Sequence, residues 1–550
     1  MNQQNHNKVT KKRSGVLPVW LLGAGLATGL LMIGLLFVII IMNGLAVFWP
    51  REVVLITLHH ESGAGPGGRT EFGASILDQR SISGSSEGSE EYYLYVGSDE
   101  VLGDKFHYIP LEDVIDLSKP KAAMVAERYA HGSALLIPES LEDENGAIVM
   151  ANSPQFNEAL KKAISNSAEK RKALHDLESG DIAKVNRALE MLAINERKLL
   201  NNSTQSTQLE ELRKERTALE KRHESLAAIA QSLRDEANQA KLYYRLLSGE
   251  AITQPIQEIL SVHQPNAMGI FDKIWYFITH FIKYALDDPR EGNTEGGIFP
   301  IIVGTFVLTI LMSIVVMPLG VIAAIYLREY ARPGPIVQFV RIAVSNLAGV
   351  PSIVYGVFGL GFFVYFLGGH IDTLFFSDRL PSPTFGTGGI IWAALTLALL
   401  TVPVVIVATE ESLAAFPQGI REASLACGAS RFQTLIRIIL PASAPGMITG
   451  LVLAIARAAG EVAPLMLVGV VAFAPDLPFD QIAPYVHLDR KFMHMGYHIY
   501  SLGFLTQDSE AAKPMVFATT FLLIMLVVVL NIGAMLLRDK MRKRYSSETF

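Results

Sequence analysis

The chain has 550 residues, of which 50% are hydrophobic and only 18% are charged, whereas soluble proteins carry about 25% charged residues. This composition excludes a disordered or fibrous chain and indicates a membrane protein. The net charge of -6 argues against a nucleic-acid-binding protein, which needs a basic surface. The single cysteine, Cys427, excludes an intramolecular disulfide.

Six segments are long and apolar enough to cross a bilayer, which takes about 20 residues in a helix. Five contain no Asp, Glu, Lys or Arg in their apolar runs, and the other contains Arg457 and Glu461. The first segment is typical of a signal anchor, because its apolar run is longer than the roughly 15 residues of a signal-peptide core. The predicted spans are residues 16–49, 298–327, 342–368, 388–409, 442–473 and 514–537.

Lys and Arg cluster at one side of the predicted spans, and such clusters mark the cytoplasmic side. Four basic residues precede the first span, and five lie between residues 538 and 544. We therefore expect the N-terminal segment 1–15 and the tail 538–550 in the cytoplasm, and residues 51–295 in the periplasm, in a multi-pass protein of the inner (plasma) membrane.

Residues 51–295 are predicted to form a soluble insertion between the first two spans. β-branched and apolar residues predict a strand at 53–58, and 92–96 and 106–109 are further strand candidates, within an α+β part at 51–150. A helical hairpin is expected at about 155–247, with leucines every seven residues on its second helix. These are Leu212, Leu219, Leu226 and Leu233. We expect a spacer or scaffold here rather than a partner-binding surface. The predicted fold class is mainly α: six transmembrane helices plus an α+β periplasmic domain.

The loop at 410–441 carries a motif with regular spacing: Glu422-Ala423-Ser424-x3-Gly428-x9-Ile438-x-Leu440-Pro441. It resembles the cytoplasmic EAA loop of ABC-transporter permeases, E-A-A-x3-G-x9-I-x-L-P, with Ser424 in place of the second alanine. The resemblance implies a helix–turn–helix that docks on a separate ATP-binding subunit. Small side chains allow close approach of that surface, Gly428 permits the turn, and Pro441 is expected to begin the next span.

Three further segments resemble the phosphate-specific permeases of the PstA family. They are G-V-P-S-I-V-Y-G at 349–356, I-Y-L-R-E-Y at 325–330, and A-I-A-R-A-A-G-E-V-A-P-L at 454–465. The family implies an inorganic phosphate importer in which this chain forms half of the translocation path. Its implied partners are a second permease (PstC-like), a dimer of the ATP-binding subunit (PstB-like), a periplasmic phosphate-binding protein (PstS-like) and membrane lipid.

Arg457 and Glu461 are the candidate residues of the substrate path. An arginine within the bilayer costs at least about 2.5 kcal/mol, so it should face a partner or a watery cavity. Spaced four apart, the two side chains would share one helix face. Arg457 could donate transiently to a phosphate oxyanion, while Glu461 prevents the anion from being trapped. A purely structural ion pair is the alternative.

The remaining alternatives concern the transported ion and the class of protein. The permease could carry another oxyanion, such as sulfate or molybdate, or the chain could be a membrane-anchored sensor or scaffold working through its helical hairpin. The sequence contains no catalytic constellation, so the chain is not expected to be an enzyme, and no cofactor, metal site or nucleic-acid partner is expected.

Overall fold

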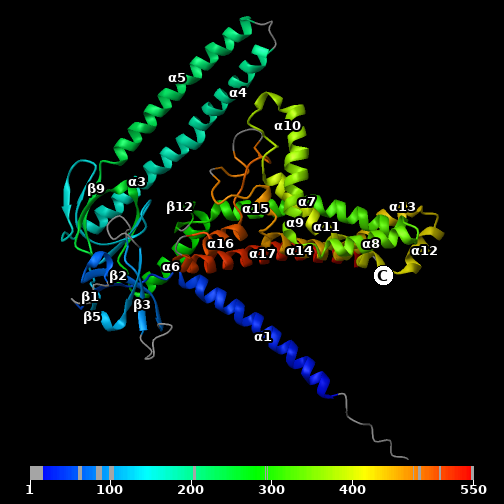
Figure 1. Ribbon diagram of the computed structural model, residues 1–550, viewed down its shortest axis with the longest axis horizontal. Helices are drawn as coiled ribbons and strands as arrows, with labels where there is room; N and C mark the ends of the chain where they lie inside the picture. The colour runs from blue at the N-terminus through cyan, green and yellow to red at the C-terminus, as the bar shows by residue number, and fades with distance from the viewer. Residues whose placement is uncertain are drawn as a thin grey trace, which may run out of the picture.

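The computed structural model describes residues 16–59, 65–81, 90–97, 105–201, 206–290, 293, 295–474, 476–480, 485–506 and 509–546. Within these ranges an α+β part, built from the insertion, joins a bundle of long apolar helices (Figure 1). The predicted segment 1–15 lies outside the described residues. The predicted fold class, mainly helical with six membrane spans and an α+β insertion, is confirmed.

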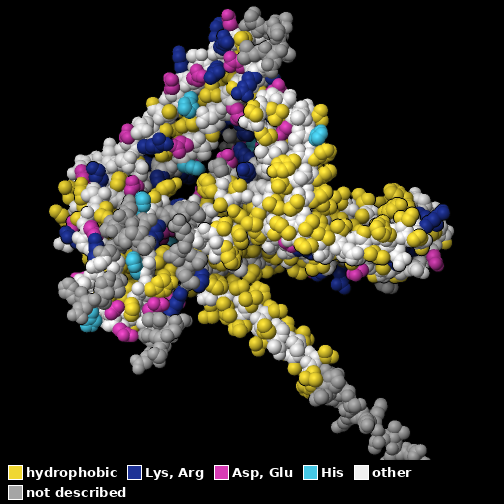
Figure 2. Space-filling view, in the orientation of Figure 1, with side chains coloured by type: hydrophobic (Ala, Val, Ile, Leu, Met, Phe, Trp, Pro, Cys, Tyr) yellow, Lys and Arg dark blue, Asp and Glu magenta, His cyan; other side chains and the backbone are white. Residues whose placement is uncertain are grey.

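Six helical segments among the described residues are long and apolar enough to cross a membrane. Their helices are α1 (Val16–Ala46), α7 (Phe299–Ile325), α9 (Ser352–Phe358) continuing to α10 (Gly369–Phe375), α11 (Ile390–Ala414), α14 (Leu440–Gly460) and α17 (Ser509–Ser546). The core of the bundle lies between α7, α11 and α14, where Met312, Leu397 and Ala454 are fully buried. Apolar side chains also cover the outside of these helices, whereas charges gather on the insertion (Figure 2).

The third span begins at Ser352 and not at residue 342. Residues Pro335–Leu347 form a separate helix, α8. The chain turns before Pro351, because a proline disfavours helical backbone at the residue that precedes it. The span then runs past the predicted end at 368 to Phe375. It includes Asp372, whose buried carboxylate accepts hydrogen bonds from the backbone N–H groups of Phe385 and Gly386.

The fifth span is one helical run, Arg431–Gly460, and not residues 442–473. It consists of α13 (Arg431–Thr434), a π-helical turn over Leu435–Ile439, and α14. Pro441 therefore lies inside the run and does not begin it. The wider π turn over Leu435–Ile439 accommodates the pyrrolidine ring of Pro441, which would otherwise clash with a backbone carbonyl of the preceding turn. After Gly460 the chain is extended, and α15 (Leu465–Val468) follows.

Two antiparallel sheets form the α+β part. The first has the order β4-β3-β2-β1-β5 and the second β10-β9-β7-β6-β11, with β8 paired to β7. The strands are β1 (Val53–Leu58), β2 (Glu71–Ser81), β3 (Glu90–Tyr95), β4 (Phe106–Pro110), β5 (Val114–Ser118), β6 (Met124–Arg128), β7 (Ala134–Glu142), β8 (Ile148–Met150), β9 (Lys241–Leu246), β10 (Ala251–Pro255) and β11 (Ile259–His263). The three predicted strands are confirmed as β1, β3 and β4.

The prediction that the α+β part ends at residue 150 is wrong, because β9, β10 and β11 complete the second sheet. The helical hairpin is inserted between β8 and β9, and β9 returns to pair with β7. For the same reason the predicted hairpin boundary at 247 is wrong: its last helix, α5 (Ser206–Ala237), ends before β9.

The hairpin itself is present. Its first arm is α3 (Phe156–Asp176), a π-helical stretch and α4 (Ala183–Asn201), and its second arm is α5. The predicted leucines of α5 are half-buried. Glu196 of α4 pairs with Arg213 and Arg216 of α5, at 3.5 and 3.3 Å. The arms therefore combine an apolar seam with cross-helix ion pairs, as expected of a rigid support.

The structure contains one long element in the insertion that the sequence analysis missed. Helix α6 (Ile270–Leu286) connects the second sheet to the membrane half and packs beside the start of α7. A short ribbon of β12 (Pro289–Arg290) and β13 (Glu295–Gly296) follows it. Helix α6 thus joins the insertion to the membrane spans (Figure 1).

Candidate functional site

The loop between α11 and α14 forms a helix–turn–helix at the end of the bundle remote from the insertion (Figure 1). Its first helix is α12 (Gln418–Ala426) and its second is α13. The backbone N–H of Ala429 donates to Ser424 O, and that of Gly428 donates to Leu425 O. This pair of hydrogen bonds is typical of a helix that ends in a residue with left-handed backbone. Here that residue is Gly428, whose φ is 86°. Glycine is needed here because a Cβ would strain that backbone.

The predicted coupling residues separate into exposed and internal ones. Glu422 and Ala423 are exposed on α12, so a partner could reach them. Ser424 is buried instead, and its Oγ lies 2.9 Å from Thr434 Oγ1 of α13. The small side chain at 424 thus allows a close approach of α12 to α13, and its hydroxyl bonds the two helices. Ile438, Leu440 and Pro441 are half-buried in the run leading into the fifth span.

An ion pair that the sequence analysis did not identify holds this loop against the bundle. Arg421 Nη1 lies 2.7 and 2.9 Å from the two carboxylate oxygens of Glu329, and Arg421 Nη2 donates to Leu413 O at 2.7 Å. Glu329 belongs to the family-like segment at 325–330 and Arg421 directly precedes the coupling motif. Two motifs that are remote in sequence thus meet at one contact, the Arg421–Glu329 ion pair.

Arg457 and Glu461 lie at the end of α14. Their Nε and Oε1 atoms are 3.4 Å apart, so the predicted ion pair forms. The expectation that both residues share a helix face is wrong, because the helix ends at Gly460 and Glu461 is extended. The two side chains remain 34% and 21% exposed. Arg457 Nε is buried and its contact with Glu461 is an ion pair without hydrogen-bond geometry.

The segment after Glu461 packs against another family-like motif. A Cβ at Gly356 of α9 would lie 2.7 Å from Pro464 Cα, so only glycine allows this close approach. Tyr355 and Leu465 are buried beside the contact. The structure therefore brings the 349–356 and 454–465 segments together near the end of α14, which carries Arg457.

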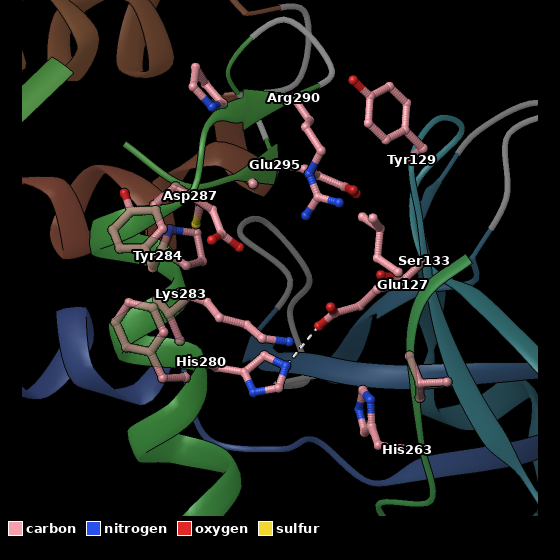
Figure 3. Close-up of a pocket in the computed structure, with 18 of the residues that line it drawn as sticks. Glu127, Tyr129, Ser133, His263, His280, Lys283, Tyr284, Asp287, Arg290 and Glu295 are labelled. Carbon is pink, nitrogen blue, oxygen red and sulfur yellow. Dashed lines mark hydrogen bonds and ion pairs between the residues drawn. The ribbon is translucent and has the colours of Figure 1, made fainter. Parts of the chain in front are cut away.

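A cavity of about 1330 Å³ lies between the insertion and the membrane half. Figure 3 shows side chains from β6, β11 and α6 converging on it. Glu127 accepts hydrogen bonds from His280 Nε2 at 2.9 Å and from Ser261 Oγ at 2.7 Å. Burial opposes ionisation of Glu127, but these bonds outweigh it and lower its pKa to about 2. The sequence spacing could not predict that these residues meet, because they lie on strands and a helix that are far apart in the chain.

We expect His263, beside this cluster, to make the stability of the insertion depend on pH. Burial lowers the pKa of His263 to about 4, against an ordinary value of about 6.5. The unfolded chain therefore binds the proton at a higher pH than the folded chain, and acidification between these values destabilises the fold. From pH 7 to pH 5 the loss is expected to be about 2 kcal/mol.

This loss can be measured by hydrogen exchange of β6 and β11 in the full chain, corrected for the intrinsic pH dependence of exchange. His263→Phe should remove most of it, and because His263 Nδ1 has no hydrogen-bond partner, the replacement orphans no group at that nitrogen. The exposed His175, replaced in the same way, serves as the control. An unchanged pH dependence in His263→Phe would show that another group titrates.

The hairpin also contacts two loops of the membrane half. Lys198 of α4 pairs with Asp378, which follows α10, at 3.2 Å. Arg187 Nη2 lies 3.3 Å from His487 Nδ1, and His487 Nε2 lies 3.0 Å from Asp480 Oδ1. The support predicted from the sequence is thus bonded to two loops of the membrane half rather than projecting freely.

Comparisons with known proteins are consistent with this architecture. Residues 316–544 match the family described as binding-protein-dependent transport system inner membrane component. The chain is 31% identical to phosphate transport system permease protein PstA 1 of Mycobacterium tuberculosis (strain CDC 1551 / Oshkosh), over 48% of this chain and 78% of that protein. It is 34% identical to PstA of Mycobacterium leprae (strain TN), over 38% and 62%. It is 32% identical to the probable ABC transporter permease protein YqgH of Bacillus subtilis (strain 168), over 35% and 59%.

The chain thus spans about three fifths of the length of the last two relatives, 62% and 59%. The family match begins at residue 316, after the insertion, α6 and the start of α7. The chain belongs to the family of binding-protein-dependent transport system inner membrane components, as a PstA-like ABC permease.

Proposed function

We propose that the chain is the transmembrane permease subunit of an ATP-driven inorganic phosphate importer. The observation that carries the proposal is the helix–turn–helix at one end of the bundle, with Glu422 and Ala423 exposed and Ser424 and Gly428 internally bonded. The cargo rests on relatives whose names state phosphate transport. ATP hydrolysis is supplied by a separate subunit, and this chain contributes half of the translocation path.

The orientation belongs to the same proposal. Both termini and the coupling loop face the cytoplasm, and residues 51–295 face the periplasm. The basic residues near the span ends support this orientation. The position of the coupling loop, remote from the insertion, also supports it (Figure 1).

The mechanism requires two states of the bundle. Closure of the ATP-binding dimer would press on α12, and the Arg421–Glu329 pair would transmit that displacement to the end of the second span. ATP and phosphate must then bind the inward-open and outward-open states with different affinity, because a ligand without such a difference shifts no equilibrium. Arg457 offers donors to the oxyanion in passing, and Glu461 competes for them so that the anion can leave.

Reconstitution of the complete complex tests the proposal. The chain is co-purified in nanodiscs with an ATP-binding subunit and a second permease, and phosphate-loaded binding protein is added. We expect the ATP-binding subunit to co-purify and its ATPase rate to rise with phosphate but not with sulfate or molybdate. If the ATPase rate rises with sulfate or molybdate and not with phosphate, that oxyanion is the cargo. If the ATP-binding subunit does not co-purify, the proposed role of the coupling loop in binding it is wrong.

A further inference from the structure

Helix α6 has three faces of different character. Seven large apolar side chains on one side are between 42% and 85% exposed. They are Ile270, Phe271, Ile274, Trp275, Ile278, Ile282 and Leu286. At about 3.6 residues per turn these positions fall within roughly 160° of the helix circumference. Phe281, at one edge of this arc, packs on the spans, but no described residue covers the seven side chains themselves. An apolar stripe this wide normally faces a core.

The other two faces of α6 are occupied. One packs on the spans: Phe277 and Phe281 contact Phe48, just after α1, with ring centroids 6.3 and 5.3 Å apart. The other meets the insertion, where His280 bonds Glu127 and Lys273 pairs with Glu52 at 3.5 Å. The exposed stripe is therefore not explained by a loosely packed helix, because α6 is held firmly on both remaining sides.

The contacts of α6 with α17 indicate how deep α6 lies in the membrane. On the proposed orientation, Arg538 marks the cytoplasmic boundary of the sixth span. Counting back about 20 residues, the length that crosses the hydrocarbon core, places the outer boundary near Ala518. Tyr284 Oη lies 2.7 Å from Thr519 Oγ1, and the ring centroid of Phe281 lies 6.3 Å from that of Phe521. The C-terminal half of α6 thus lies at the outer edge of the hydrocarbon core.

We propose that α6 is an interfacial helix whose exposed apolar stripe contacts the lipids of the outer leaflet. The inference rests on the orientation in the proposed function. Lipid is the occupant because the stripe lies beside the outer end of α1, whose apolar window has 0% of its residues buried. Tryptophan is typical of the membrane–water boundary, and Trp275 is 69% exposed in the middle of the stripe. Amphipathic helices with this pattern lie in the plane of the interface.

This contact has a consequence for the insertion. Because α6 lines the cavity on its polar side, a lipid-bound α6 fixes Glu127, His280 and the second sheet at a set height above the bilayer. The hairpin, which starts from that sheet, is then held where it meets the loops at Asp378 and His487. The membrane surface itself would serve as the third support of the insertion, besides α7 and the hairpin contacts.

Fluorescence quenching of Trp275 tests the proposal, since the chain has four tryptophans. Trp20, Trp49 and Trp392 are replaced by phenylalanine, and the full chain is placed in nanodiscs. We expect lipids brominated on the acyl chain to quench Trp275 by at least half, and aqueous iodide to quench it weakly. A matched variant that keeps only Trp392, which is 2% exposed inside the bundle, should resist both quenchers.

Two results would overturn the lipid contact. Strong quenching by iodide without quenching by brominated lipid would place the stripe in water. Resistance to both quenchers would mean that protein, such as a second copy of the chain, covers it.

Labelling with a membrane-impermeant maleimide separates this outcome from a wrong orientation. In intact cells, Ser232→Cys on exposed α5, combined with Cys427→Ser, should be labelled, and the native exposed Cys427 should not. Reversed labelling would overturn the orientation and with it the outer leaflet. Correct labelling with Trp275 unquenched by brominated lipid would overturn the lipid contact alone.

Discussion

Phosphate uptake by the reconstituted importer is expected to fall about 10- to 100-fold when Arg457 is replaced by alanine or glutamine. A hydrogen bond to a charged group contributes about 1.5–3 kcal/mol, and its loss at the point of passage slows transport accordingly. Arg457→Lys should retain part of the activity, because it keeps the charge but not the planar pair of donors. Uptake of radiolabelled phosphate per assembled complex is the measurement.

The ion pair itself provides the control. If Arg457 and Glu461 were only a structural pair, the exchanged variant Arg457→Glu/Glu461→Arg would restore both assembly and uptake. We expect it to restore assembly, because the two charges still lie next to each other at the helix end, but not uptake. Normal uptake in well-assembled Arg457→Ala would remove Arg457 from the substrate path.

The second large effect is expected at the coupling loop. Glu422→Arg should abolish association with the ATP-binding subunit, because it reverses a charge on an exposed part of α12, while the folded permease remains intact. A charge buried in an interface without a partner costs several kcal/mol, enough to dissociate a complex of moderate affinity. Co-purification and ATPase coupling are measured together with the thermal stability of the permease.

Glu224→Arg on exposed α5 makes the same change in net charge on the insertion. It should leave co-purification unchanged. If both variants bind the ATP-binding subunit normally, α12 is not the docking helix. If Glu422→Arg alone loses stability, the glutamate supports the loop rather than the partner.

Much of the fold could be predicted from the sequence, because the bilayer imposes a simple rule. A helix must be apolar over about 20 residues to cross it, and all six spans were located in this way. The errors came from breaks inside apolar stretches. An apolar stretch does not reveal that the chain turns before Pro351, or that α14 stops at Gly460 with Glu461 extended beyond it.

The insertion was predicted less well, because its sheets depend on distant pairing. Strands β1, β3 and β4 carry a local signal, whereas β9 belongs to the fold only through its register with β7 across the hairpin. The stripe of α6 has a helical period that could have been recognised before the structure was known. It was missed because α6 is strongly apolar and lies next to the second span in the sequence.

The candidate site divides in the same way. The sequence by itself determined the coupling motif, the left-handed turn at Gly428 and the unusual charges at Arg457 and Glu461, because each depends on local backbone geometry or on residue type in an apolar stretch. Only the tertiary structure decided that Ser424 faces Thr434, that Arg421 binds Glu329 and that Gly356 meets Pro464. It also decided that α6 contacts α17 at the end of the bundle nearest the insertion. These contacts join segments that are remote in the chain, and such pairs are selected by the packing of whole helices rather than by any local pattern.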